Sequence, residues 1–246
     1  MTYHPFEIEG DDRPARWLVI CDHAMNTVPP FVNGGTLGLP ASDMERHIAY
    51  DAGAAGVARA LARHLDAPAI LSNFSRLVID PNRGEDDPTL VMRLYDGTII
   101  AANRDADAAE INLRLNRCYR PYHTALAELA ARRGDTVIVS IHSFAPQLRN
   151  RPPRPWHVGV LYGADARLSR PLIASLRAEP DLCVGENEPY GGHLPGDTIA
   201  RHAIAWGRPN TLLEIRSDLI GTPAQQAAWA ARLAPVLEDA AARAGV

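Results

Sequence analysis

The sequence has few cysteines, no long apolar run and no basic leader, and each of these absences excludes a class of protein. Cys21, Cys118 and Cys183 are far apart and form no CxxC pair, so neither a zinc ribbon nor a redox dithiol is expected, and a reducing compartment fits this usage. No run of about 18 apolar residues occurs, and the N-terminal residues are acidic where a signal peptide would be basic and then apolar. We therefore expect a cytoplasmic protein that does not span a membrane.

Several signatures of common enzyme classes are also missing. The chain contains no GxGxxG, GxxxxGK[ST], GxSxG or HExxH motif, which argues against dinucleotide-binding, nucleoside-triphosphate-binding and serine-hydrolase functions. The net charge of −4 and the absence of a Lys/Arg-rich stretch indicate neither a nucleic-acid surface nor a membrane surface. The expected partner is a small molecule.

What the sequence does contain is a regular alternation of short apolar runs with segments of helical periodicity. Hydrophobic residues make up 46% of the 246 residues, which is typical of a globular protein, and we expect one domain over residues 1–246. Strands are predicted at 17–22, 69–72, 77–80, 136–142, 157–162, 182–185 and 211–216, and helices at 52–65, 106–133, 168–178, 197–206 and 223–244. Pro121 predicts a kink or a break in the longest of these helices, 106–133. The alternation predicts an α/β fold, a mixed and mostly parallel sheet with helices on both faces, which binds ligands at the carboxyl ends of its strands.

Two histidines lie at the ends of predicted strands. His23 follows the first strand and His142 ends the clearest one. Either histidine alone is more often a hydrogen-bonded core residue than a ligand. Two imidazoles from neighbouring strand ends, however, can converge on one Zn²⁺, which in catalytic sites commonly takes three protein ligands and a water.

A third ligand is then required. Asp51 precedes the helix predicted after the first strand, and its carboxylate can return to the same crevice, while Asn26 and His47 are the alternatives. Aspartate is also a favoured N-cap residue, so the ligand and the helix cap remain competing interpretations of Asp51.

The remaining candidates are a buried acid and a basic cluster. Glu214 lies in an apolar strand, where a charge is costly unless it is paired with an arginine or functional; near a metal it would serve as general base and acid. Arg76, Asn82 and Arg83 surround the predicted strand 77–80, and such a group can polarise a carbonyl and bind a carboxylate.

Eight motifs together resemble the N-formylglutamate amidohydrolase family: CDHAMN, RHIAYDAG, SRLVIDPNR, PYH, IHSFAP, RPWHVGVL, ENEPYGG and LLEIRSDLI. This resemblance runs from about residue 15 to 240. It implies hydrolysis of an N-formyl amino acid such as N-formylglutamate to formate and the amino acid, in histidine degradation. More distantly, the motifs resemble the zinc carboxypeptidase and aspartoacylase fold, of phosphorylase/hydrolase type, whose first two ligands form an HxxE motif. Here Asn26 stands three residues after His23, and Asp51 opens the segment that resembles the helix beginning at that glutamate.

The resemblance implies a role for each candidate residue. His23, Asp51 and His142 would bind Zn²⁺, Glu214 would be the general base, and Arg76 would polarise the scissile carbonyl. The substrate carboxylate would be bound by the segment that contains Asn82 and Arg83, and Ser143 and Arg216 are further substrate-binding candidates on the two matching strands. The alternatives are hydrolysis of another N-acyl amino acid or short peptide, binding of a carboxylate-bearing metabolite without catalysis, and a metal that only braces the fold.

Overall fold

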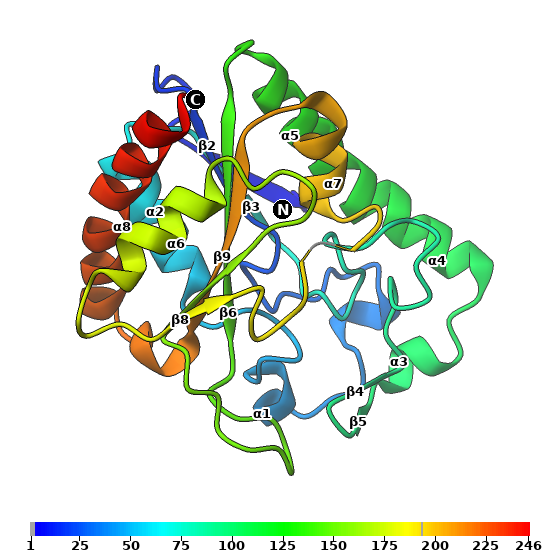
Figure 1. Ribbon diagram of the computed structural model, residues 1–246. Coiled ribbons are helices and arrows are strands. Elements are labelled where there is room, and N and C mark those ends of the chain that lie inside the picture. The colour runs from blue at the N-terminus through cyan, green and yellow to red at the C-terminus, as the bar shows by residue number, and fades with distance from the viewer. Residues whose placement is uncertain (1–2, 193) are drawn as a thin grey trace.

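A seven-stranded mixed sheet forms the centre of the protein in the computed structural model, which describes residues 3–192 and 194–246 (Figure 1). Its strands are Phe6–Glu9 (β1), Trp17–Cys21 (β2), Ala69–Ser72 (β3), Val137–Phe144 (β6), Val158–Leu161 (β7), Val184–Glu186 (β8) and Asn210–Arg216 (β9). The spatial order is β1-β3-β2-β6-β9-β7-β8. Strands β3, β2, β6 and β9 are mutually parallel, β7 and β8 run parallel to each other, and the β1–β3 and β9–β7 pairs are antiparallel. The predicted mixed, mostly parallel sheet is confirmed.

Helices cover both faces of the sheet (Figure 1). The helices are Ala41–Met44 (α1), Ala54–His64 (α2), Ala101–Arg104 (α3), Ala108–Arg114 (α4), Arg120–Ala131 (α5), Ser169–Arg177 (α6), Thr198–His202 (α7) and Pro223–Ala244 (α8). Helices α2, α6 and α8 pack on one face in a core with the odd-numbered residues of β6 from Val137 to Ile141. The other face carries α5, whose Tyr122 and Leu126 share a second core with Ile138. None of the helices in the described ranges is long and apolar enough to cross a membrane.

The sheet topology brings the carboxyl ends of β2, β6 and β9 together. In the parallel β6–β9 pair, His142 is the register partner of Glu214. Residues of β6 alternate between the two faces, so the side chain of His142 lies on the same face as that of Ile138, toward α5. Side chains from three neighbouring strands therefore meet at one edge, where ligands bind in such folds.

The prediction of a strand at residues 77–80 is wrong. This apolar segment is a turn, and Leu77, Val78 and Ile79 are fully buried. Its carbonyl groups are bonded by side chains instead of a neighbouring strand: Asn103 Nδ2 donates to Leu77 O (2.7 Å), and Arg114 Nη1 donates to Val78 O (2.9 Å). Side-chain donors therefore allow an apolar run to be buried without a β-ladder.

Three further findings concern the ends and irregularities of the elements. Of the two competing interpretations of Asp51, the helix cap is wrong, because α2 begins at Ala54 with Gly53 (φ +81°) at the N-cap position and no side-chain cap. The predicted irregularity near Pro121 is confirmed, since a π-helical turn, Leu115–Tyr119, joins α4 to α5. Sequence patterns missed β1 and the hairpin of Leu94–Tyr95 (β4) with Thr98–Ile99 (β5).

Candidate metal centre and active site

A cavity of about 620 Å³ lies at the carboxyl ends of β2, β6 and β9. It is lined by eight of the nine residues that the sequence singles out: His23, Asp51, Arg76, Asn82, Arg83, His142, Ser143 and Glu214. His47, Tyr95, Tyr190 and Asp197 also line it. The ninth candidate, Arg216, does not belong to this lining.

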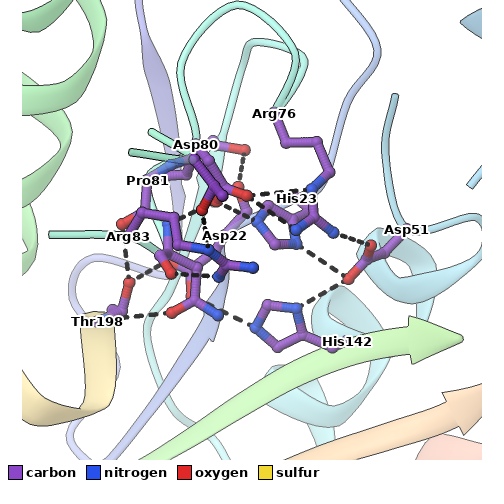
Figure 2. Close-up of polar contacts among 12 residues, drawn as sticks. Asp22, His23, Asp51, Arg76, Asp80, Pro81, Arg83, His142 and Thr198 are labelled. Carbon is purple, nitrogen blue, oxygen red and sulfur yellow. Dashed lines mark hydrogen bonds and ion pairs between the residues drawn. The ribbon is translucent and has the colours of Figure 1, made fainter. Parts of the chain in front are cut away.

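His23, Asp51 and His142 form a buried cluster in this cavity. Asp51 Oδ2 lies 3.2 Å from Nδ1 of His23 and 2.8 Å from Nδ1 of His142, and Figure 2 shows both rings turned toward this carboxylate. One ligand atom of each residue lies within 4.8 Å of the other two. The main-chain N–H of Asp51 also donates to His23 O (2.9 Å), which fixes the two segments against each other. These three side chains therefore form a candidate metal site.

The charges around the cluster also fit a cation. Three buried carboxylates, those of Asp22, Asp51 and Asp80, surround the two histidines, and Arg76 is the arginine that forms ion pairs with two of them, Asp51 and Asp80. Burial alone would raise the pKa of Asp51, but His23 and His142 outweigh it and hold this pKa below its ordinary value. Burial alone would lower the pKa of His142, but Asp22 and Asp51 outweigh it and raise this pKa well above its ordinary value. The site thus favours positive charge between its carboxylates.

Glu214 lies in the same cavity as this cluster. Its side chain is 7% exposed, and its Oε2 is buried with no hydrogen-bond partner among the described residues. Burial raises its pKa to about 7. A carboxyl group with that pKa exchanges a proton readily near neutral pH.

A glycine opposite Glu214 makes room for one wall of the cavity. Gly159 on β7 is the antiparallel register partner of Glu214, and a Cβ there would come within 1.9 Å of Glu188 O. The absence of a side chain at 159 lets the chain after Glu188 fold against the sheet, and residues 189–192 of that segment line the cavity.

Arg76 is held at the site by an aspartate. Its Nε and Nη2 donate to Asp80 Oδ2 at 3.2 and 2.8 Å, while Nη1 lies 3.6 Å from Asp51 Oδ1. The guanidinium also lies over the ring of Tyr95, with 5.5 Å between Cζ and the ring centroid. Arg76 is therefore fixed with Nη1 turned toward the carboxylate of Asp51.

Asn82 and Arg83 belong to the loop that follows Asp80. Asn82 Oδ1 accepts from the main-chain N–H of Thr198 (3.1 Å), which joins this loop to the start of α7. Arg83 donates through Nη1 to the carbonyl of Asn82 (2.7 Å) and through Nε to Thr89 Oγ1 (3.2 Å). Its guanidinium lines the cavity without a carboxylate partner among the ion pairs of the described residues.

The other candidates have different surroundings. The main-chain N–H of Ser143 donates to Asp51 Oδ2 (3.3 Å), and its hydroxyl donates to Ala52 O (2.9 Å), so this residue holds the loop that carries Asp51. Arg216 points away from the cavity: its Nε donates to Asp218 (2.8 Å), and its Nη1 faces the carbonyls of residues 154–156. Being the last residue of β9, Arg216 is free to turn toward these neighbouring carbonyls.

The two alternative ligands lie outside the cluster. Asn26 donates to Met44 O (2.9 Å) and to Glu45 (3.2 Å). His47 lines the cavity, but its Nε2 faces Asp96 Oδ2 at 3.5 Å. Neither belongs to the His-Asp-His group.

Sequence reasoning missed the residues that surround the histidines. Asp22 and Asp80 are fully buried and face His142 and His23, respectively. Thr198 donates through its hydroxyl to Asp22 Oδ1 (2.9 Å), as Figure 2 shows. The sequence contains one indication of these residues, since both aspartates directly follow apolar runs. This indication is weak, because aspartate at such a position is also a common turn residue.

Comparison with known proteins identifies the family of this chain. The family model described as N-formylglutamate amidohydrolase matches residues 15–221. The N-formylglutamate deformylase of Pseudomonas aeruginosa is 29% identical over 213 residues, which cover 78% of this chain and 75% of that protein. The crystal structure of a gene product of Agrobacterium tumefaciens is similar with a TM-score of 0.92 and 34% identity, covering 98% of this chain and 96% of that one.

A second solved structure is similar in fold. The N-formylglutamate amidohydrolase of Ralstonia eutropha has a TM-score of 0.64 and 24% identity, with 98% of this chain and 99% of that chain covered. The family model spans far more than half of the 246 residues. The chain therefore belongs to the N-formylglutamate amidohydrolase family.

Proposed function

We propose that this protein, acting as a single domain, is a zinc-dependent amide hydrolase that removes the formyl group from an N-formyl amino acid, with N-formylglutamate as the first candidate. The observation that carries the proposal is the position of Glu214, a buried acid with an unpartnered oxygen, in the same cavity as the cluster of His23, Asp51 and His142. The family and the named activity of the Pseudomonas aeruginosa relative support the substrate class.

The donor set fits zinc better than the hard cations. Two imidazole nitrogens and one carboxylate oxygen are typical zinc ligands, whereas calcium and magnesium prefer sets made of oxygens. In tetrahedral zinc sites with bonds of about 2.0–2.1 Å, ligand atoms lie about 3.3 Å apart, and the Nδ1–Oδ2 distances of 3.2 and 2.8 Å are close to this value. Zinc supplies Lewis-acid chemistry when bound: it lowers the pKa of water and polarises a carbonyl oxygen.

Glu214 carries the proton through the reaction. Its carboxylate accepts a proton from the attacking water as the water oxygen bonds to the formyl carbon. The same carboxyl group then donates this proton to the amide nitrogen as the C–N bond breaks, which yields formate and the free amino acid. A pKa of about 7 makes both protonation states accessible near neutral pH.

The arginines act on the substrate. Asp80 holds Arg76 from one side, so its Nη1 is oriented in advance to stabilise negative charge on the carbonyl oxygen. Arg83, whose loop is held by the contact of Asn82 with Thr198, offers its guanidinium to a substrate carboxylate. Formyl amides without a carboxylate are therefore expected to be poor substrates.

The proposal is tested by formate release. The purified protein is incubated with N-formylglutamate, N-formylalanine and N-formylbutylamine, the last lacking a carboxylate. Each is assayed as purified, after treatment with a chelator, and after zinc add-back. We expect chelator-sensitive, zinc-restored release, fastest for N-formylglutamate. If no substrate gives chelator-sensitive release, the proposal is wrong.

The size of the cavity favours a second candidate substrate class. About 620 Å³ is within the range of pockets that hold drug-sized ligands and is larger than formylglutamate requires. The panel is therefore extended by N-formylglutamyl dipeptides and by N-acetylglutamate, whose hydrolysis is followed by release of glutamate. Faster hydrolysis of either would assign the site to larger N-acyl amino acids or short peptides.

A further inference from the structure

Each of the two histidines has a buried aspartate on the side opposite Asp51. His23 Nε2 lies 2.7 Å from Asp80 Oδ1, and His142 Nε2 lies 3.4 Å from Asp22 Oδ2. The side chains of both aspartates are at most 1% exposed. Among the described residues, Asp22 Oδ2 and His142 Nε2 have no closer polar partner than each other. Both imidazoles are thus placed between two carboxylates.

When a metal occupies the Asp51 side of each ring, this placement decides which ring nitrogen carries the proton. A neutral imidazole has one N–H and one lone pair, and a metal binds only the lone pair. An N–H at Nε2 satisfies the outer carboxylate and leaves the Nδ1 lone pair facing Asp51. The reverse tautomer would set the Nε2 lone pair against a carboxylate and block the metal side with a proton.

Each outer aspartate is itself held in place. Asp22 Oδ1 accepts from the hydroxyls of Tyr122 (2.8 Å) and Thr198 (2.9 Å), which come from α5 and α7. These donors leave Oδ2 as the oxygen that faces His142. Asp80 Oδ2 takes both bonds from Arg76, and its Oδ1 also accepts from the main-chain N–H of Asn82 (2.9 Å). Neither carboxylate can turn away without breaking buried hydrogen bonds.

We propose that Asp22 and Asp80 are positioning residues that hold His142 and His23 as Nε2–H tautomers, so that both histidines bind the metal through Nδ1. The inference rests on the proposed metal-dependent function and adds which nitrogen is the ligand and what selects it. Tyr122 and Thr198 contribute to the same positioning, because their hydroxyls bond Oδ1 of Asp22 and leave Oδ2 to face His142. Such outer partners typically contribute 10–100-fold to metal affinity.

Asp22→Asn is the sharpest test, because Asp22 has no contact with Arg76. If the amide oxygen of the new side chain takes the bonds from Tyr122 and Thr198, its NH₂ faces His142 Nε2 and favours a proton on Nδ1. We expect zinc affinity, measured by competition with a chromogenic chelator, to fall by about 10–100-fold. Long-range ¹H–¹⁵N spectra of histidine-labelled protein should give Nε2–H for both histidines in zinc-loaded wild type and an altered signal for His142 in the variant.

Two milder variants keep the test sound if Asp22→Asn folds poorly. Tyr122→Phe and Thr198→Val each remove one hydroxyl and leave the aspartate, so each should weaken zinc binding by a smaller factor. Ser169→Ala is the matched control: Ser169 is the first residue of α6, on the other face of the sheet, and its buried hydroxyl donates to Thr211 Oγ1 on β9 (2.9 Å). It should lower thermal stability without changing zinc affinity.

The outcomes separate this inference from the function itself. If wild type binds zinc and releases formate, but zinc affinity is equal in Asp22→Asn, Tyr122→Phe and Thr198→Val, the positioning role is wrong and the function stands. Zinc bound to His142 through Nε2, with the proton on Nδ1, in the loaded wild type would also overturn it. If wild type binds no zinc, both proposals are wrong.

Discussion

The side chains of His142 and Glu214 lie opposite each other on two neighbouring parallel strands, β6 and β9, and both line the same cavity. Parallel register fixes this pairing, since a shift of one residue would turn Glu214 to the opposite face of the sheet, toward α2 and α8. The backbone register thus places the proposed metal ligand His142 beside the proposed acid–base group Glu214, whatever the conformation of the loops.

Replacement of Glu214 by glutamine should separate catalysis from metal binding. Glutamine keeps the shape of the side chain but cannot accept the proton of the attacking water, so kcat should fall by about 10²–10⁴-fold. Zinc affinity should stay within about twofold of wild type, because Glu214 is outside the ligand group. Steady-state formate release and chelator competition on the same preparation check both parts. An active Glu214→Gln variant would mean that the metal only braces the fold.

Replacement of Asp51 by alanine should remove metal binding, whereas Asn26→Ala and His47→Ala should not. Asp51 Oδ2 is the atom that both Nδ1 atoms face, so its loss should cost more than the 10–100-fold typical of an outer partner. Zinc content after dialysis against a buffered zinc concentration measures the difference. Equal zinc content in Asp51→Ala and wild type would reopen the choice of third ligand.

How far the sequence predicts this site depends on the range of the interactions involved. Apolar runs that end in polar residues were sufficient to predict β2, β6 and β9, and hence that His23, His142 and Glu214 share one edge of the sheet. Position alone also placed Asp51 in the cavity, although its role as a helix cap was an equal alternative.

Two features could not be predicted from local sequence patterns, because contacts with residues distant in the sequence determine them. The segment 77–80 has the composition of a strand, yet Asn103 and Arg114, distant in sequence, bond its carbonyls and make it a turn. Arg216 was grouped with the site because β9 carries it, but carbonyls of residues 154–156 and Asp218 hold its guanidinium elsewhere. No local pattern contains such contacts.

Arg83 and Arg216 should therefore respond differently to replacement by alanine. Loss of a charge-assisted bond to a substrate carboxylate costs about 1.5–3 kcal/mol, so Arg83→Ala should lower kcat/KM on N-formylglutamate by about 10–100-fold, mainly through KM. Arg216→Ala should leave kcat/KM within about twofold, because this side chain does not line the cavity. If kcat/KM of Arg83→Ala equals that of wild type, Arg83 does not anchor the carboxylate.

A pair of buried histidines joins α5 to α7 behind the site. His123 Nδ1 lies 2.9 Å from His202 Nε2, the rings are stacked, and His123 Nε2 faces Pro81 O at 3.0 Å. Burial lowers the pKa of His123 to about 3 and that of His202 to about 4, and the nearby Arg201 adds to both shifts. Both rings are therefore neutral in the folded protein near neutral pH.

This histidine pair should make the free energy of unfolding smaller as the pH falls below about 6.5. Below the ordinary histidine pKa of about 6.5 the unfolded chain binds a proton at each position and the folded protein does not, so the stability present above pH 6.5 is lost as pH falls toward 4, by about 2 kcal/mol per histidine at pH 5. Urea unfolding at pH 7 and pH 5, with chelator present throughout because metal binding also depends on pH, measures the loss. His202→Gln and His123→Gln/His202→Gln should each show a smaller difference between the two pH values than wild type, even if they are less stable at pH 7. Equal differences in all three proteins would mean that the pair is not what sensitises the fold to acid.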